Sequence, residues 1–62
     1  MCLARVYKGD DREENLLMES VTFLEQEDGK VTMTSLFNDK KTLPGVIKTI
    51  NFNGSIVMIA AE

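Results

Sequence analysis

A tight turn between two strand-like runs is the feature that most restricts the fold of this chain. Asp28 and Gly29 separate residues 21–26 from residues 31–37, and both runs are rich in β-branched and aromatic residues. Asp-Gly is a favoured pair in type I′ turns, because both central residues of such a turn need a positive φ. The sequence therefore predicts a β-hairpin centred on this pair.

The register of this hairpin follows from the position of its turn. Counting outward pairs Glu27 with Lys30 and Leu24 with Met33. Because side chains alternate along a strand, one face then carries Leu24, Val31 and Met33, and the other carries Val21, Phe23 and Leu36. Both faces are partly apolar, so we expect the hairpin to lie between the core and a second covering surface.

A second hairpin is predicted near the end of the chain. Asn53 and Gly54, again a type I′ pair, separate residues 46–52 from residues 55–61. Counting outward from this pair predicts that Asn51 pairs with Ile56, Ile50 with Val57 and Thr49 with Met58. Residues 56–61 are apolar on both faces, which indicates a strand that is central in a sheet or covered by another chain.

The rest of the chain adds shorter strands. Residues 2–8 alternate loosely between apolar and polar, as in a half-buried strand. After the charged residues 9–14, either a short helix begins, with Asp10 as its cap and Glu13 in the capping box, or residues 15–20 form a strand. Residues 38–41 read as a turn and residues 41–43 as a brief strand.

Pro44 and Gly45 are suited to the second and third positions of a type II turn, which would end that brief strand. Together these segments predict an all-β fold, a small barrel or rolled sheet of about six short strands in a single domain spanning residues 1–62. A chain of 62 residues buries only about 60% of its unfolded surface, so its own core is marginal and association with another chain would help it.

Composition narrows the possible partners and location. There is no apolar run of about 18 residues and no secretory leader pattern, so we expect no membrane partner and a cytoplasmic protein. The net charge is −3, and the seven Lys and Arg residues are scattered, with Lys40 and Lys41 as the one adjacent pair. We therefore expect no nucleic-acid partner, because phosphate affinity depends on clustered basic residues.

The candidate metal ligands are Cys2 and Met1. Cys2 is the only cysteine and there is no histidine. If Met1 is removed, the amine and thiol of Cys2 can form a five-membered chelate ring; if Met1 is retained, its amine, the Cys2 amide nitrogen and the sulfur can form two fused rings. Such N and S donors suit Ni(II) or Cu(II) in a square plane better than tetrahedral Zn(II). The alternative is that Cys2 is a small apolar residue in a buried strand.

Other residues could bind metal but have simpler explanations. Three methionines, at positions 18, 33 and 58, lie within strand patterns and are expected to pack in the core. The carboxylates of Asp10, Asp11, Glu13 and Glu14 could hold a hard cation, but a solvated charged loop is the better explanation.

Several of these segments together resemble one family. Residues 1–6 (MCLARV), the run 31–37 followed by Asn38 and Asp39, the Pro44-Gly45 step and the closing hairpin at residues 53–56 are similar to the CooT family of small nickel-binding proteins. The resemblance covers essentially the whole chain, and its most specific part is the Met-Cys start.

The resemblance implies a fold, a partner and a metal. It implies an SH3-like β-barrel, a homodimer, and a role in nickel delivery to carbon monoxide dehydrogenase, with Cys2 as the Ni(II) ligand. Two Cys2 thiolates brought together in a dimer would complete a four-coordinate site, so we expect one Ni(II) per dimer and binding that is linked to association.

Three other functions compete with nickel binding as explanations of this sequence. An enzyme with an amino-terminal cysteine nucleophile is not expected, because Leu3 follows Cys2 where such enzymes have glycine and no histidine can act as a base. We therefore predict that the protein is not an enzyme. A small RNA-binding or protein-interaction barrel without metal, and a plain dimerisation module in which Cys2 only packs, remain as alternatives.

Overall fold

The computed structural model describes residues 3–61, and these form an all-β fold. In chain order the elements are β1 (Ala4–Lys8), the 3₁₀ turn η1 (Glu13–Asn15), β2 (Leu16–Glu27), β3 (Lys30–Ser35), β4 (Lys40–Asn51) and β5 (Ile56–Ala61). The predicted all-β class is confirmed. The described residues contain five strands where about six were expected, because β2 and β4 each join two segments that the sequence suggested were separate.

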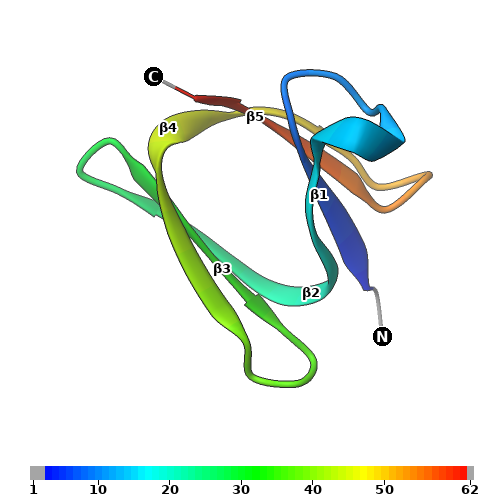
Figure 1. The fold of residues 1–62 in the computed structure, drawn as a ribbon, viewed down its shortest axis with the longest axis horizontal. Coiled ribbons are helices and arrows are strands. Elements are labelled where there is room, and N and C mark those ends of the chain that lie inside the picture. The colour runs from blue at the N-terminus through cyan, green and yellow to red at the C-terminus, as the bar shows by residue number, and fades with distance from the viewer. Residues whose placement is uncertain (1–2, 62) are drawn as a thin grey trace.

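The five strands form one sheet that closes on itself as a ring, which Figure 1 shows end-on. Neighbouring strands along the chain pair antiparallel, and β1 closes the ring by pairing parallel with β5. β5 therefore has a strand on each side, which is the first of the two alternatives predicted from its apolar sequence. The SH3-like type and the homodimer stay predictions.

β2 turns a corner at Ser20 and Val21, where it exchanges one neighbouring strand for another. Its first half pairs with β1 as far as Val21, and from Val21 onward it pairs with β3. Ser20 has a φ of 55°, in the left-handed region that non-glycine residues seldom occupy. The backbone thus changes direction at this point without ending the strand.

β4 turns a similar corner at Pro44 and Gly45, so the predicted type II turn at this pair is wrong. Pro44 is the last residue paired with β3, and Gly45 is the first paired with β5. The Gly45 N–H donates to the Gly29 carbonyl oxygen at 2.8 Å. The Pro-Gly pair therefore marks a change of partner strand and not an interruption between two strands.

The hairpin at Asp28 and Gly29 forms as predicted. Both residues have positive φ, 52° and 73° respectively. The predicted pairs, Leu24 with Met33 and Glu27 with Lys30, are both present.

The predicted sharing of a face by Val21 and Phe23 is wrong. The β2–β3 register shifts by one residue between them, so a bulge turns Val21 into the interior while Phe23 points outward. Val21 is 4% exposed and Phe23 is 53% exposed. A bulge of this kind changes which residues share a face, and it is invisible to a simple count of alternation.

The second hairpin has the predicted register but a different turn. Its three predicted pairs, Asn51 with Ile56, Ile50 with Val57 and Thr49 with Met58, are all present. The expected positive φ is absent at Asn53 and Gly54 and occurs instead at Ser55, with a φ of 55°. The connection is a four-residue loop, stabilised by the Asn51 side-chain oxygen, which accepts hydrogen bonds from the N–H groups of Asn53 and Gly54 at 3.0 and 3.3 Å.

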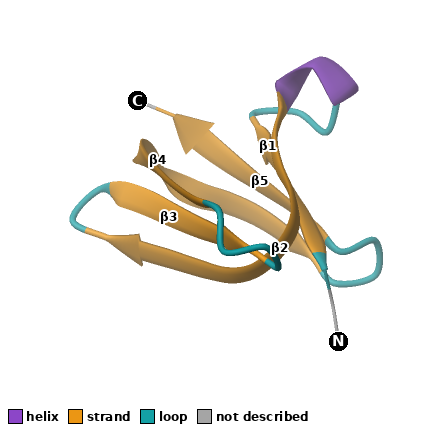
Figure 2. Cartoon of the chain, turned by 60° about the horizontal axis from the view of Figure 1, so that its bottom comes forward, coloured by secondary structure: helices purple, strands orange, loops and turns teal. Residues whose placement is uncertain are grey.

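The charged segment before β2 forms a single 3₁₀ turn, so the longer helix considered for this region does not occur. Arg12 precedes the turn and provides no side-chain cap. Leu16, which follows the turn, begins β2. The alternative expectation of a strand from about residue 15 is confirmed. Figure 2 shows this short turn beside the strands.

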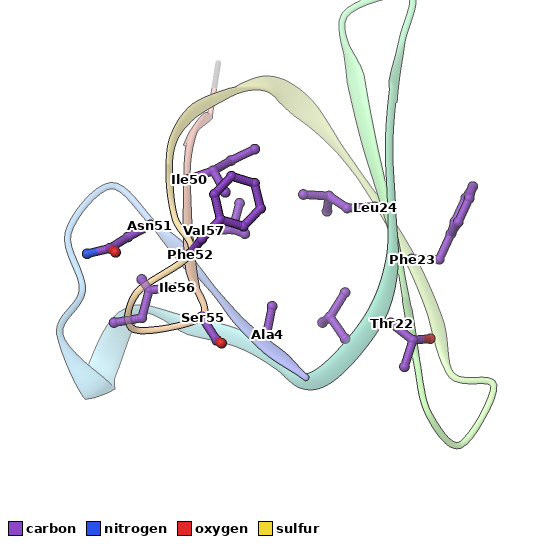
Figure 3. Close-up of a pocket in the computed structure, with 11 residues that line it drawn as sticks. Ala4, Thr22, Phe23, Leu24, Ile50, Asn51, Phe52, Ser55, Ile56 and Val57 are labelled. Carbon is purple, nitrogen blue, oxygen red and sulfur yellow. The ribbon is translucent and has the colours of Figure 1, made fainter. Parts of the chain in front are cut away.

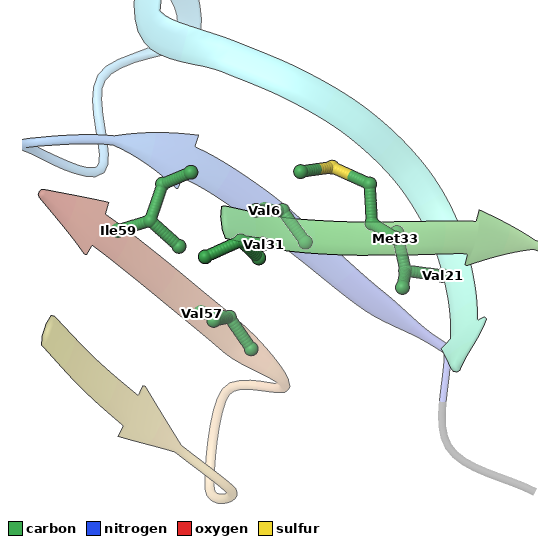
Figure 4. Close-up of a cluster of buried hydrophobic side chains, with 6 residues drawn as sticks. All are labelled: Val6, Val21, Val31, Met33, Val57 and Ile59. Carbon is green, nitrogen blue, oxygen red and sulfur yellow. The ribbon is translucent and has the colours of Figure 1, made fainter. Parts of the chain in front are cut away.

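The core lies inside the ring and draws on four strands (Figure 4). Its buried members are Val6, Val21, Val31, Met33, Val57 and Ile59. Along β3 the burial alternates, with Val31 and Met33 facing inward as predicted. Half-buried side chains from β2 and β4 pack around this cluster. The resulting core is small, as expected from the length of the chain.

Candidate functional site

The predicted metal ligands, Met1 and Cys2, lie outside the residues that the structure describes. What it does establish is the position of the chain immediately after them, because Ala4 begins β1. The described chain therefore enters the fold at the end of the ring at which β1 starts.

Two other parts of the chain adjoin the start of β1. The Arg5 N–H donates to the carbonyl oxygen of Ser55, in the loop before β5, at 3.0 Å. Ala4 pairs with Val21 at the corner of β2. The preceding residue, Ser20, accepts a hydrogen bond from the Leu36 N–H at 2.8 Å. The loop before β5 and the turn after β3 are thus both held close to the start of β1.

The turn after β3 presents apolar side chains to solvent on a rigid backbone. The buried Ser35 hydroxyl oxygen accepts hydrogen bonds from the N–H groups of Phe37 and Asp39, at 3.1 and 3.2 Å. Asn38 adopts a φ of 69°, which asparagine tolerates better than most residues. Phe37 is 73% exposed and Leu36 is 49% exposed. The turn is therefore fixed in shape while its largest side chains lack cover within the described chain.

A cavity of about 260 Å³ opens at the same end of the ring (Figure 3). Its walls come from β1, β2, β4, β5 and the loop before β5, and Ala4 is one of its lining residues. Figure 3 shows Leu24 and Ile50 pointing toward each other across the opening, while Phe23 points away from it. Phe52, which borders the opening, is 86% exposed. The interior of the ring is thus filled at one end and open at the other.

The sequence did not predict this cavity. The sequence feature most closely related to the cavity is the presence of apolar residues on both faces of the first hairpin. Phe23 and Leu36 are exposed, so the second covering surface expected for that hairpin is not provided by residues 3–61. That covering surface stays a prediction.

The other candidate ligands are placed by the structure as follows. Met33 is fully buried in the core, Met18 packs against the core, and Met58 is half-buried in β5. The carboxylates at positions 10, 11, 13 and 14 are all solvent-exposed. Within residues 3–61, no group of three or more His, Cys, Asp or Glu side chains is arranged to hold a metal ion.

Charged contacts near this end of the ring are weak. The Arg5 guanidinium lies 3.8 Å from a Glu19 carboxylate oxygen, and both side chains are more than half exposed. Exposed pairs of this kind contribute little to stability.

No helix among residues 3–61 has the length and apolar character needed to cross a membrane.

Comparison with known proteins identifies relatives of the chain. A family model described as CO dehydrogenase accessory protein CooT matches residues 1–60. The fold is similar to the crystal structure of a protein from Carboxydothermus hydrogenoformans described as CooT, with a TM-score of 0.84, 20% sequence identity and 98% of each chain covered. No curated protein matches the chain. The family match extends over both predicted ligands and over every strand of the ring except the last residue of β5.

Proposed function

Because this chain belongs to the CooT family of CO dehydrogenase accessory proteins, we propose that it binds Ni(II) through Cys2 and supports nickel delivery to a CO dehydrogenase or another nickel enzyme. The ion is cargo in this role. The family consists of accessory proteins, which agrees at the family level with the expectation that the chain is not an enzyme. The observation that carries the proposal is the family match, since it includes Met1 and Cys2.

The donor chemistry supports nickel as the cargo. Cys2 supplies the only thiolate of a chain that has no histidine. The nitrogen of Cys2 can close a five-membered chelate ring with the sulfur. If Met1 is retained, its amine can close a second, fused ring. Thiolate and nitrogen donors in a near-planar set suit Ni(II). One chain supplies two or three such donors, and a second Cys2 would complete a four-coordinate site.

A surface suited to pairing the chains lies near the start of β1. Leu36 and Phe37 are exposed on the rigid turn after β3, and the hydrogen bond from the Leu36 N–H to Ser20 places this turn one strand away from Ala4. Burial of these apolar side chains between two chains would favour association. It would also bring two Cys2 residues to the same interface. In this arrangement nickel binding stabilises the dimer, because the metal binds the associated state.

A titration with Ni(II), followed by the sulfur-to-nickel charge-transfer absorption, tests the proposal. The protein should carry no tag at its amino end, because a tag would remove the amine donor. The Cys2→Ser variant is expected to lose the absorption and the tight binding. A matched control combines Cys2→Ser with Asp11→Cys, which moves the thiol to an exposed loop position that has no neighbouring amine. It should not restore binding. Tight nickel binding by Cys2→Ser would refute the proposal.

A further inference from the structure

Two half-strands of the ring have a backbone edge that no other strand covers within residues 3–61. After its corner, β2 pairs with β3 on one side only, and after its own corner β4 pairs with β5 on one side only. The side-chain oxygen of Gln26 on β2 accepts a hydrogen bond from the Ile47 N–H on β4 at 2.9 Å. The two open edges therefore face each other, and a side chain links them at one point.

Beyond this link the edges diverge around the cavity described above. Leu24 of β2 and Ile50 of β4 point into it from opposite sides (Figure 3). Ile50 is 46% exposed although it pairs with the buried Val57 and faces inward. The cavity volume of about 260 Å³ is below the roughly 300–1,000 Å³ of typical small-molecule pockets. It is better suited to a few inserted side chains than to a free ligand.

The outer face of the β2 edge has a distinct chemical character. Phe23, Glu25 and Glu27 alternate with the inward-facing Leu24 and Gln26, and all three are exposed. A strand added at this edge would place its outward side chains beside them. Opposite charges in cross-strand pairs are favourable and like charges are unfavourable. Glu27 already lies opposite Lys30 on β3, but Glu25 lies opposite the uncharged Thr32. The Glu25 carboxylate therefore favours a basic strand, and it disfavours pairing with the same acidic edge of a second copy.

We propose that this edge binds an extended segment of a partner protein in which apolar residues alternate with lysine or arginine. The segment adds as a strand to β2, its backbone hydrogen-bonding to the open edge. Its apolar side chains enter the cavity between Leu24 and Ile50, and a basic side chain lies beside Glu25. The proposal goes beyond metal binding and requires no nickel, so it stands or falls separately from the function of Cys2.

Nuclear magnetic resonance titration of the ¹⁵N-labelled, metal-free protein tests this site. The probe is an acetylated and amidated peptide that alternates lysine with valine. Saturable shifts are expected at the amides of Leu24, Gln26 and Ile50. A peptide with glutamate in place of lysine should bind about tenfold more weakly. Absence of saturable binding, equal affinity for the two peptides, or shifts confined to other strands would overturn the proposal.

Variants test whether a basic peptide, and not a second copy of the chain, binds at the β2 edge. Glu25→Lys is expected to weaken binding of the lysine peptide about five- to tenfold, and Ile50→Asp should abolish it, with the spectrum of each free variant confirming its fold. Glu13→Lys, on η1 away from the cavity lining, is the matched control and should leave the affinity unchanged. If dilution of the protein alone shifts the same amides and the peptide does not compete, a second copy occupies the edge and the proposal is wrong.

Discussion

Replacement of Met33 by alanine tests whether the small core inside the ring holds this fold together. Met33 is 0% exposed and lies among valine and isoleucine side chains from four strands. Each buried methylene-sized group contributes about 0.8 kcal/mol, and a cavity left in a core adds to the loss. We expect Met33→Ala to lower the free energy of unfolding by about 3 kcal/mol. A core of this size supplies only about 3–5 kcal/mol in total, so the variant should keep at most about 2 kcal/mol of stability.

Urea denaturation followed by circular dichroism measures this loss. The comparison should be made at one protein concentration and without metal, because association and nickel both add apparent stability. Met18→Ala is the matched control, since Met18 is only half-buried against the same core, and it should cost about half as much. A loss below about 1 kcal/mol for Met33→Ala, or a larger loss for Met18→Ala, would refute the assignment of Met33 to a sealed interior.

Two further substitutions test the turns. Ser35→Ala removes the acceptor of the Phe37 and Asp39 N–H groups and should cost about 1–2 kcal/mol, a fall of roughly 4–16 °C in the thermal midpoint; a fall of less than about 2 °C would show that water replaces the hydroxyl. Gly29→Ala should cost about 1 kcal/mol because its φ is 73°, whereas Gly54→Ala, outside the left-handed region, should stay within about 0.5 kcal/mol. Equal losses in the two glycine variants would contradict the difference between the turns.

The pairing within the two hairpins could be predicted because it depends on local sequence. Asp28 and Gly29 supply the positive φ values of their turn, and the pairs from Glu27–Lys30 as far as Phe23–Thr34 follow by counting. At Asn53 and Gly54 the same counting also gave the correct pairs. The loop conformation differed because the Asn51 side chain accepts the hydrogen bonds of a wider turn.

The corners could not be predicted because they depend on strands distant in sequence. Pro44 and Gly45 carry a turn signal, but the chain continues in extended form since β3 and β5 hold successive parts of β4. The bulge between Val21 and Phe23 likewise arises at the point where β2 exchanges β1 for β3. Local propensity is overridden when a closed ring requires a strand to change neighbours.

The candidate site was predicted in part. The resemblance to the CooT family rested on short segments such as the Met-Cys start, and the family match confirms it over residues 1–60. The exposed turn at Leu36 and Phe37 and the open cavity beside Ala4 were not predicted. They arise from contacts between distant segments, which a count along one strand does not reveal.

Native mass spectrometry of the untagged protein with Ni(II) would decide whether two chains hold one ion between them. The proposed site predicts a species of two chains and one nickel, and its loss in Cys2→Ser. Phe37→Asp, which places a charge on the exposed turn near the start of β1, should shift the protein toward single chains that hold nickel weakly. A tightly bound nickel on a single chain, or a nickel-loaded dimer of the Cys2→Ser variant, would contradict the proposed site.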